Sequence, residues 1–534
     1  MDYQARRFTY QRCTDQHAAI AARHAVVIVG AGPVGMTLAL DLAQQNIPVV
    51  ILDDDDKLSA GSRAICFAKR TLEIWDRLGV GDAMVAKGVS WNVGKVFFRD
   101  APVYSFDLLG EEGHRRPAFI NLQQYYAEGF LSDAVAQTPQ IDVRWHSRVV
   151  GVDNVADGVK LTVATPDGTY ALNADYLVAC DGSRSAVRKL LGLESKGQTF
   201  RDRFLIADVK MTAPFPSERW FWFDPPFHPN QSVLLHRQPD NVWRIDFQLG
   251  WDADPEEEKK PERVRMRVQA LLGPDAEFEF EWISVYTFAC MRMERFRHGR
   301  VLFAGDAAHL VSPFGARGAN SGVQDADNLG WKLGRVAVGD APDSLLDSYA
   351  AEREYAADEN ILNSTRATDF ITPKSEISGV FRNAVLELAK QHPFARKLVN
   401  SGRLSVPSTL HASPLNTPDA DAFSGMMVPG AAALDAPVFA DGRQQWFLGL
   451  LGRGFVVVSV AQAEPANPTL ALHLSRDGTE DSTVTPSTEW LKRYDAQPGT
   501  TYLFRPDQHV CARWRTYDEQ AVNAAIARAS GKRE

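Results

Sequence analysis

Glycines at positions 30, 32 and 35 have the type and spacing that can hold a phosphate group. Together with Pro33 they form a GxGxxG motif, and Asp53 follows at the end of the next apolar run. Glycine permits a tight turn and a close approach of the backbone to a pyrophosphate, and a helix that starts there offers free N–H groups to the phosphate oxygens. The Gly30, Gly32, Gly35 and Asp53 pattern therefore indicates a nucleotide, with Asp53 accepting hydrogen bonds from the ribose hydroxyls.

The elements around these glycines predict a βαβ unit. Residues 25–29 form a continuous apolar run, 36–45 have helical character, and 48–52 read as a second strand. Because both strands, the helix and the acid are in register, a glycine turn without a ligand is the weaker interpretation. The acidic run 54–56 would repel a 2′-phosphate, which favours FAD or NAD over NADP, and the motif alone does not separate FAD from NAD.

Two further segments combine a buried strand, a glycine turn and a helix. The first, ADYLVACDGSRSAVRKLLG, turns at Asp181 and Gly182; the second turns at Gly305 and Asp306 and continues as GDAAHLVSPFGARGANSGVQDADNLGWKL. A stretch so rich in permissive residues predicts that main-chain groups closely approach something bound there. His309 directly follows the second strand and is interpreted as a structural histidine.

In these three motifs the chain resembles the single-component flavoprotein aromatic hydroxylases, the p-hydroxybenzoate hydroxylase fold family. GxGxxG, DGSRSAVR and GDAAH occur in the family's order, and the resemblance covers residues 25 to 366 and, more weakly, the remainder. Phenol and 3-(3-hydroxyphenyl)propionate hydroxylases are the most similar branch. The resemblance implies bound FAD, with NADH or NADPH as a transient co-substrate, and the choice between the two stays open.

The resemblance also implies roles for single residues. Asp306 would bind a ribityl hydroxyl of FAD, and Asp181 with Gly182 would lie near the pyrophosphate and the path of the nicotinamide nucleotide. Gln124 matches a glutamine on the ribityl and phosphate side. Arg63 matches an arginine close to the flavin and the substrate pocket.

The loop that ends in a helix start at 318 is expected to hold the flavin ring. Gly315 and Gly318 would let the backbone run close to the ring, and Gly318, Ala319 and Asn320 would direct N–H groups at N1 and O2. A reduced flavin concentrates negative charge at those atoms, so oriented donors at a helix N-terminus would stabilise it. Pro313 would lie alongside the reactive edge of the ring.

Residues 196–290 alternate and are rich in aromatic side chains, which predicts an antiparallel sheet. Laid over the flavin, such a sheet would exclude water from the substrate pocket. The candidate pocket residues are Trp220, Trp222, His236, Arg244 and Tyr286. No catalytic base is assigned.

The chain has 534 residues, too many for one compact core. The predicted fold class is α/β: a Rossmann-like FAD-binding domain, an inserted antiparallel substrate sheet and a C-terminal thioredoxin-like domain that lacks CxxC. The predicted divisions are an extension at 1–24, FAD domain at 25–195 with a substrate-side hairpin near 90–115, substrate sheet at 196–290, FAD domain again with helices at 291–400, linker at 401–424 and C-terminal domain at 425–534.

Charge and composition exclude several function classes. The net charge of −9 argues against nucleic acid and against anionic membrane surfaces. No secretory signal and no apolar run of about 20 residues occurs, so a cytoplasmic protein is expected. The five cysteines are scattered without metal-ligand spacing, so no metal site is expected. A homodimer is the expected assembly.

Together these features predict an FAD-dependent monooxygenase that hydroxylates a phenolic compound with NAD(P)H and O2 through a flavin C4a-hydroperoxide. The alternative is an epoxidase or reductase of the same fold acting on a non-aromatic, isoprenoid-like substrate, since a fold does not determine a reaction. An NAD dehydrogenase would leave the second and third motifs unexplained.

Overall fold

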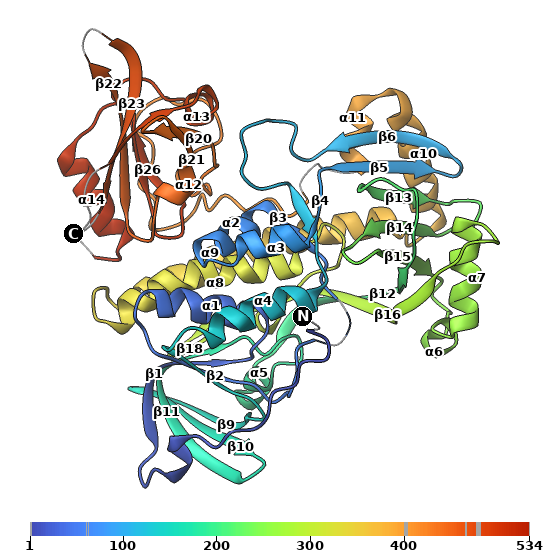
Figure 1. The fold of residues 1–534 in the computed structure, drawn as a ribbon, viewed down its shortest axis with the longest axis horizontal. Helices are drawn as coiled ribbons and strands as arrows, with labels where there is room; N and C mark the ends of the chain where they lie inside the picture. The colour runs from blue at the N-terminus through green and yellow to red at the C-terminus, as the bar shows by residue number, and fades with distance from the viewer. Residues whose placement is uncertain are drawn as a thin grey trace.

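The computed structural model describes residues 3–59, 61, 63–399, 404–464, 467–476 and 482–532. Figure 1 shows a central α/β part, a sheet on its right, and a separate β-rich part at the upper left formed by the C-terminal residues. Among the described residues, no helix has the length and hydropathy needed to cross a membrane. The same residues contain no cluster of three His, Cys, Asp or Glu side chains suited to a metal ion.

The central sheet is Rossmann-like. Its strand order is β17 (Arg297–His298), β18 (Val301–Phe303), β11 (Gly168–Ala179), β1 (Ala22–Val29), β2 (Val49–Leu52) and β8 (Ile141–Arg144). The ladders from β18 to β8 are parallel, and β9 (Arg148–Val155) and β10 (Gly158–Thr165) extend the sheet antiparallel from β11. The βαβ unit expected from the first motif is confirmed, with a first strand that begins three residues early.

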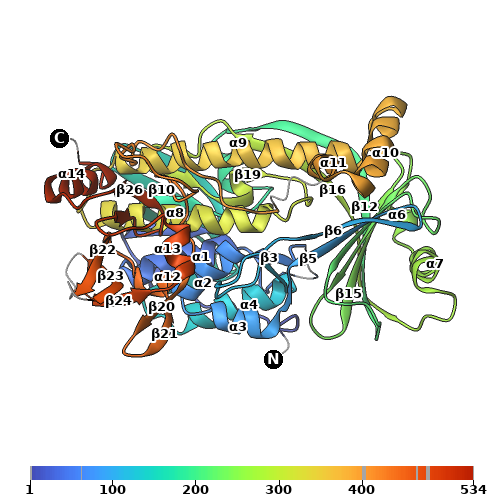
Figure 2. The same ribbon diagram turned by 90° about the horizontal axis from the view of Figure 1, so that it is seen from above.

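Long helices pack together on this sheet. The helix α1 (Pro33–Gln44) contacts α4 (Gln124–Ala136) and α8 (Gly318–Ala337), and α8 contacts α9 (Leu345–Ile371). Figure 2 shows α9 running along the molecule from the side of the C-terminal part towards the second sheet. Smaller elements complete this part: η1 (Thr14–His17), α2 (Lys69–Arg77), α3 (Gly81–Lys87), α5 (Ala186–Leu190), η2 (Gly305–Ala307) and the three-stranded sheet of β3 (Cys66–Ala68), β7 (Phe119–Asn121) and β4 (Val89–Trp91).

The predicted substrate sheet has eight strands. Their order is β19 (His309–Leu310), β16 (Glu279–Met293), β12 (Ser195–Lys210), β15 (Val242–Leu249), β14 (Ser232–Arg237), β13 (Arg219–Phe223), β5 (Val93–Phe98) and β6 (Ala101–Asp107). The hairpin expected near 90–115 thus forms one edge, and β19, which directly follows the GD motif, forms the other.

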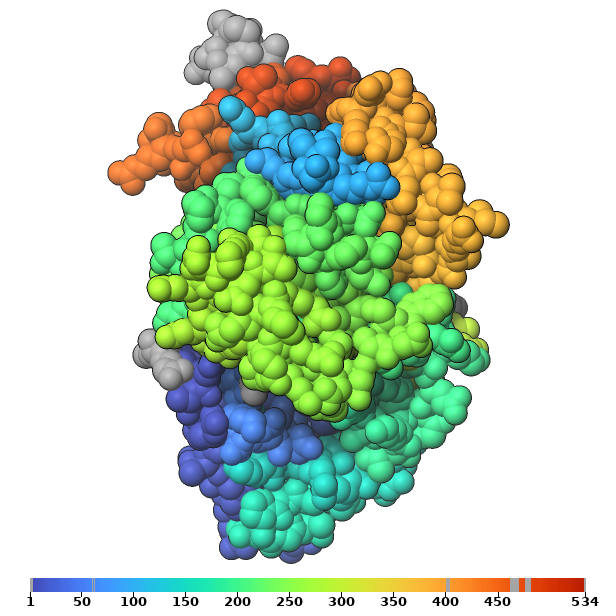
Figure 3. Space-filling view, turned by 90° about the vertical axis from the view of Figure 1, so that its right-hand side faces the viewer, coloured from blue at the N-terminus to red at the C-terminus, as the bar shows by residue number. Residues whose placement is uncertain are grey.

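Helices cover both faces of the substrate sheet. On one face, α7 (Pro261–Leu272), which follows α6 (Pro255–Glu258), packs Val264 and Val268 against the strands. On the other, α10 (Glu376–Gln391) and α11 (Pro393–Val399) pack against strands that include β5 and β6. Figure 3 shows α10 and α11 in orange beside the blue hairpin.

The C-terminal part is built on a seven-stranded sheet. Its order is β21 (Arg443–Trp446), β20 (Pro437–Ala440), β24 (Ser482–Pro486), β23 (Asn467–Arg476), β22 (Val456–Glu464), β25 (Thr501–Phe504) and β26 (Val510–Trp514). The helices are α12 (Phe447–Leu450), α13 (Thr488–Arg493) and α14 (Glu519–Ala529). Every pairing among the described strands is antiparallel. The thioredoxin-like expectation is not confirmed. A helix that crosses between neighbouring strands joins a parallel pair, and no pair among the described strands of this sheet is parallel.

Candidate cofactor and substrate site

The three glycines of the first motif are required for different reasons. Gly30 has φ +107°, and a Cβ there would lie 2.5 Å from the Cys180 carbonyl oxygen. A Cβ at Gly35 would lie 2.0 Å from the Gly30 carbonyl oxygen. Gly32 has no protein atom within 4 Å of such a Cβ, and it caps α1 without a side chain. Gly30 and Gly35 therefore allow strand and helix to pack closely, while Gly32 faces open space at the helix N-terminus.

Asp53 lies directly after β2 and supports this turn. Its Oδ2 accepts a hydrogen bond of 2.6 Å from the Ala31 N–H, and its Oδ1 accepts one of 2.9 Å from the Asp55 N–H. Burial raises the pKa of this carboxyl above its usual value, although the two backbone donors oppose that shift. The acid expected to meet a ribose is thus placed beside the glycine turn, as the spacing predicts.

Asp181 of the DG motif has one occupied and one unoccupied oxygen. Its Oδ2 accepts a hydrogen bond of 3.0 Å from the Val187 N–H, whereas Oδ1 is buried and has no hydrogen-bond partner among the described residues. Burial raises its pKa. Arg188 joins this motif to the GD motif, because its Nη1 donates to the Ala307 carbonyl oxygen at 2.7 Å.

Asp306 of the GD motif lies in a recess. Its side chain is exposed, yet the surrounding protein desolvates the carboxyl and raises its pKa, against the opposing charges of His309 and Arg63. A group that is both accessible and closely surrounded by protein faces a cavity. Asp306 can therefore accept hydrogen bonds from a bound polyol.

Asp325 holds the GD turn in place, and sequence reasoning missed it. Its Oδ2 accepts from the Gly305 N–H at 2.9 Å and lies 2.6 Å from His309 Nε2, while Oδ1 accepts from Arg353 Nε at 2.6 Å. Burial alone would raise the pKa of Asp325, but His309 and Arg353 hold it below its usual value. The only sequence signal was a carboxylate inside an otherwise buried helix, and the structure places His309 in the structural role expected for it.

The helix α8 begins where the flavin-binding donors were expected. Gly315 and Ala316 have φ values of +100° and +53°, and no side chain caps the helix. The first N–H groups of any α-helix lack intrahelical partners, so Gly318, Ala319 and Asn320 present donors. Asn320 itself is fixed: its Oδ1 accepts from Ala68 N–H and Thr71 Oγ1, both at 2.7 Å.

The neighbouring loop residues also have defined places. Phe314, between Pro313 and Gly315, packs edge-on against Phe204 and Phe288 of the substrate sheet, with ring centroids 5.0 and 5.5 Å apart. The proline loop is therefore held against the sheet by an aromatic contact. This contact brings the loop expected at the flavin ring directly to the substrate side.

Gln124 contacts residues that precede β3, and Arg63 is one of the residues just before that strand. Gln124 Oε1 accepts from the Ala64 N–H at 3.1 Å, and its Nε2 donates to Ser59 Oγ at 3.0 Å. Arg63 is exposed, and its carbonyl oxygen accepts from Arg244 Nη1 at 3.3 Å. Ser59 and Ala64 are thereby tied to α4, and Arg63 is tied to the substrate sheet.

Strand alternation separates the five pocket candidates into two groups. His236 pairs with Arg244 across β14 and β15, and Tyr286 lies on the same face, which also carries Phe204. Trp220 and Trp222 lie on the opposite face.

There the two tryptophans pack with aromatic residues and α7: Phe97, Phe215, Phe227 and Val268. Trp220 and Trp222 thus lie on the opposite sheet face from His236, Arg244 and Tyr286, so a pocket on one face of the sheet does not include all five candidates. Neighbouring residues of a strand point to opposite faces, and aromatic content alone did not reveal which face meets the cofactor.

The charges of two motif residues, Asp306 and Arg63, act on this sheet face. Burial raises the pKa of Tyr286, Asp306 raises it further and Arg63 lowers it, so the phenol lies near both groups. Arg244 forms a buried two-point ion pair with Asp208, at 2.8 and 2.7 Å. Burial and the charges of Arg219 and Arg244 lower the pKa of His236 well below its usual value, so this imidazole is neutral.

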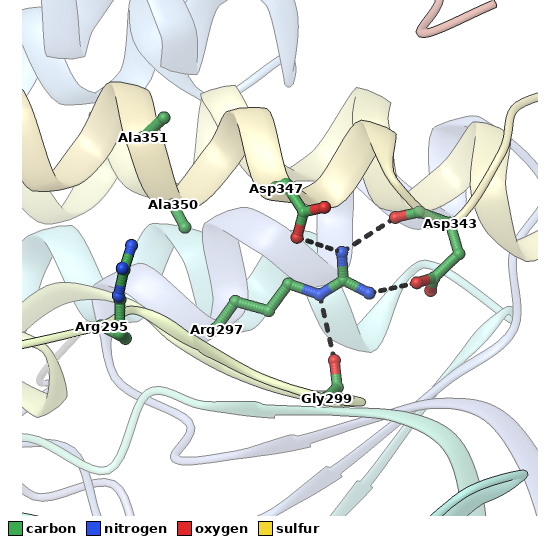
Figure 4. A pocket seen from close by; sticks show the side chains of 7 residues that line it. All are labelled: Arg295, Arg297, Gly299, Asp343, Asp347, Ala350 and Ala351. Atoms are coloured by element: carbon green, nitrogen blue, oxygen red, sulfur yellow. Dashed lines mark hydrogen bonds and ion pairs between the residues drawn. The ribbon is translucent and has the colours of Figure 1, made fainter.

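A surface hollow of about 500 Å³ between β17 and α9 is not part of this site (Figure 4). Its Arg297 donates to Asp347 and to the Gly299 carbonyl oxygen and is also paired with Asp343. The lining contains none of the motif residues, and the arginine charge is already compensated.

A family profile described as "FAD binding domain" matches residues 23–364. The chain therefore belongs to this family of FAD-binding proteins. The fit rests on the open space at Gly32, the unpartnered Asp181 Oδ1, the recessed Asp306 and the uncapped start of α8.

Curated relatives carry monooxygenase names. A 3-(3-hydroxy-phenyl)propionate/3-hydroxycinnamic acid hydroxylase of Mycolicibacterium smegmatis is 30% identical over 382 residues, which is 70% of this chain and 66% of that protein. A 12-dehydrotetracycline 5-monooxygenase/anhydrotetracycline 6-monooxygenase of Streptomyces rimosus is 33% identical over 383 residues, covering 68% and 73%. The matched part thus spans about two thirds of the length of these relatives.

A solved structure supports the fold over almost the whole chain. The flavin-dependent monooxygenase PieE, in complex with FAD and substrate, superposes with a TM-score of 0.80 at 21% identity, covering 96% of this chain and 100% of that one. At this identity the likeness establishes the fold alone. It extends over the C-terminal part, which the family profile does not reach.

Proposed function

We propose that this protein is an FAD-dependent monooxygenase that hydroxylates a phenolic aromatic compound with NAD(P)H and O2. The observation that carries the proposal is the packing of Phe314, from the proline loop, against Phe204 and Phe288 of the substrate sheet, on the face that also carries Tyr286. The polar face of the substrate sheet and the residues expected around the flavin therefore border the same space. The two curated relatives, both named as hydroxylases or monooxygenases, support the same reaction class.

FAD, when bound, supplies the redox chemistry: it accepts hydride from the nicotinamide and activates oxygen. The protein's part is to bind and orient it. The α1 N-terminus at Gly32 would hold the pyrophosphate, Asp53 the ribose and Asp306 the ribityl chain. The N–H groups at the start of α8 would stabilise negative charge on the ring.

The substrate side combines exclusion of water with a few polar groups. Phe204, Phe288 and Phe314 form a buried aromatic cluster between the sheet and the proline loop. Excluding water protects reactive oxygen chemistry from hydrolysis and proton leakage. Tyr286 stays neutral because its pKa is raised, so its hydroxyl can donate a hydrogen bond to a substrate oxygen.

The polar residues also bear on the alternative function. An isoprenoid-like substrate needs an apolar channel, whereas the face beside the cofactor residues carries His236, Arg244 and Asp208, all buried. Burying such groups against an apolar chain would be costly. We therefore favour a polar aromatic substrate over the epoxidase or reductase alternative.

The decisive experiment measures NADH and NADPH oxidation by the FAD-loaded protein under air, with a panel of phenols, and identifies products by mass. A phenol that accelerates oxidation and gains one oxygen atom would establish the hydroxylase and its nicotinamide preference. The proposal would be wrong if the protein bound no FAD, or if it oxygenated isoprenoid compounds and no phenols.

We also propose a homodimer, as expected from the sequence. The helix α10 supports this, because it exposes Ile377, Val380 and Phe381 on its surface, at 83%, 65% and 57%. Apolar groups gathered on one surface commonly mark an interface. Light scattering on the eluting protein tests it, and a monomer at micromolar concentration would contradict it.

A further inference from the structure

Arg219 is a buried cation that the described part of the chain leaves unpaired. It begins β13 and is only 8% exposed. Among the described residues its guanidinium makes no hydrogen bond and no ion pair, and burial lowers its pKa. Arginine nevertheless stays charged in proteins. A buried, uncompensated charge is costly, so the position of Arg219 calls for an anion.

The groups beside Arg219 do not supply that anion. Arg219 lies opposite Gly94 of β5, on the sheet face that also carries Phe221 and, on the next strand, His236. Asp208, three strands away on β12, is already engaged by Nε and Nη2 of Arg244. Cys66 is a neutral thiol, because burial raises its pKa to about 11.

Asp246 is the remaining acid near Arg219, and the two do not form an ion pair. One of its oxygens, Oδ1, is buried without any hydrogen-bond partner. Burial raises its pKa to about 6. Asp246 is mostly ionised above this pH, but among the described residues it makes no hydrogen bond or ion pair with the guanidinium, so the donors of Arg219 stay unoccupied.

The surroundings place this cation in the substrate space. The Cys66 carbonyl oxygen accepts from Asn320 Nδ2 at 2.9 Å, so the strand beside Arg219 is anchored to the start of α8. On the other side, the Phe106 ring covers Gly94, since a Cβ on this glycine would lie 2.1 Å from the ring. A ligand at Arg219 would thus meet aromatic walls and lie on the cofactor side of the sheet.

We propose that Arg219 determines substrate specificity by binding a carboxylate, so that the substrate is a phenolic acid anion. The inference rests on the proposed function and narrows it to one substrate class. A guanidinium binds a carboxylate through two parallel hydrogen bonds, and the pairing is stronger where water is excluded. The neighbouring residues leave the donors of this guanidinium unoccupied, so the ligand supplies the missing partner.

The test is a binding titration that needs no turnover. FAD-loaded protein is titrated with 3-(3-hydroxyphenyl)propionate, with its primary amide and with 3-phenylpropionate, and the flavin absorbance change is followed. We expect both acids to bind more tightly than the amide by on the order of 10–100-fold, the range of a hydrogen-bonded charge. In Arg219→Met the acids should fall to the level of the amide, whose affinity stays unchanged, and Arg219→Lys should retain part of the preference.

Arg237→Met is the matched control. Arg237 lies on the opposite face of the neighbouring strand, over the Trp243 ring, and this variant should keep the full preference for acids. Equal binding of acid and amide by the wild type, or an equal loss of both in Arg219→Met, would overturn the proposal.

The proposal would also be wrong if the protein recognised a phenolate instead of a carboxylate. In that case the amide would bind tightly once its phenol ionises, and 3-phenylpropionate would bind weakly. Failure of the proposed function looks different, because acids would then bind with the full Arg219 dependence while no oxygenated product formed.

Discussion

Individual charged residues of this protein fall into two kinds. Some are fully paired, such as Asp325 with His309 and Arg353, and they hold backbone turns in place. Others, such as Asp306 and Arg219, are surrounded by protein but keep unoccupied hydrogen-bonding capacity. A buried polar group without a partner costs free energy, so the second kind is where a cofactor or substrate is expected.

Replacement of Asp306 by alanine should weaken FAD binding. The reason is the loss of a charge-assisted hydrogen bond to the cofactor, which corresponds to on the order of 10–100-fold in affinity. Fluorescence titration of the apoprotein with FAD measures it. Asp340→Ala, in the exposed turn after α8, is the control and should leave the affinity unchanged. An Asp306→Ala protein with wild-type FAD affinity would remove this residue from the cofactor site.

Binding of an acidic ligand should depend on the protonation of Asp246. Its pKa is raised to about 6 by burial and by Asp208, against the opposing charges of Arg244 and Arg219. Below this pH Asp246 is neutral, and above it the carboxylate repels the ligand. The affinity for 3-(3-hydroxyphenyl)propionate should therefore fall as pH rises between roughly 5 and 7.

Asp246→Asn provides the comparison for this pH dependence. His236 stays neutral over the same range, because its pKa is lowered well below its usual value. The affinity of Asp246→Asn should consequently show no step near pH 6, measured by the same flavin titration. The same pH step in both proteins would show that another group titrates.

At the scale of elements, the site is built where strands end and helices begin. The β1–α1 turn and the start of α8 each present backbone donors, and the DG turn before α5 presents the buried Asp181 Oδ1. Each turn is tied to another element by a side chain: Asp53 to Ala31, Arg188 to Ala307 and Asn320 to Ala68. The positions of the donors therefore depend on contacts between elements that lie far apart in sequence.

Two glycines of the first motif should give separable effects. Gly35→Ala places a methyl group 2.0 Å from a carbonyl oxygen, so the apoprotein should lose about 1–3 kcal/mol of unfolding free energy. Gly32→Ala meets no protein atom within 4 Å, so the apoprotein should unfold normally while FAD binds more weakly. Thermal unfolding and FAD titration of both variants test this. If Gly32→Ala bound FAD like the wild type, the open space would not hold the pyrophosphate.

At the scale of the whole molecule, a buried ionic cluster joins the C-terminal part to the helices of the FAD-binding part. Arg505 binds Glu352 of α9 at 2.6 Å and Asp507 at 2.5 Å, and Lys332 of α8 binds Glu352 at 2.6 Å. All four side chains are fully buried. Apolar contacts among Trp331, Leu345, Phe455 and Leu503 lie in the same interface. The C-terminal part is thus an integral piece of the fold.

Arg505→Met should destabilise the folded chain by about 3–5 kcal/mol, because it leaves two buried carboxylates with too little positive charge. Thermal unfolding measures the loss, and limited proteolysis should release the C-terminal part more readily. The control is Lys196→Met, which breaks an exposed ion pair with Glu294 and should leave the melting temperature unchanged. Equal melting temperatures for Arg505→Met and the wild type would show that the cluster does not hold the two parts together.

The sequence predicted much of the cofactor side, because that side is made of local motifs. The GxGxxG turn, the strand before it and the acid after it are close together in the chain, so their spacing alone specifies the βαβ unit. The C-terminal part was harder to predict from the sequence. Its strands could be recognised, but its antiparallel order depends on pairings between distant segments.

What the sequence by itself determined is the family, the cofactor and the residues around the three motifs, since short-range spacing controls turns and helix starts. Only the tertiary structure showed that Trp220 and Trp222 lie on the opposite face of the substrate sheet from His236, Arg244 and Tyr286. The same long-range packing buries Arg219 without a partner among the described residues. It also gives Asp325 three hydrogen-bonding partners. Burial and charge compensation arise from residues far apart in sequence, and no local pattern records them.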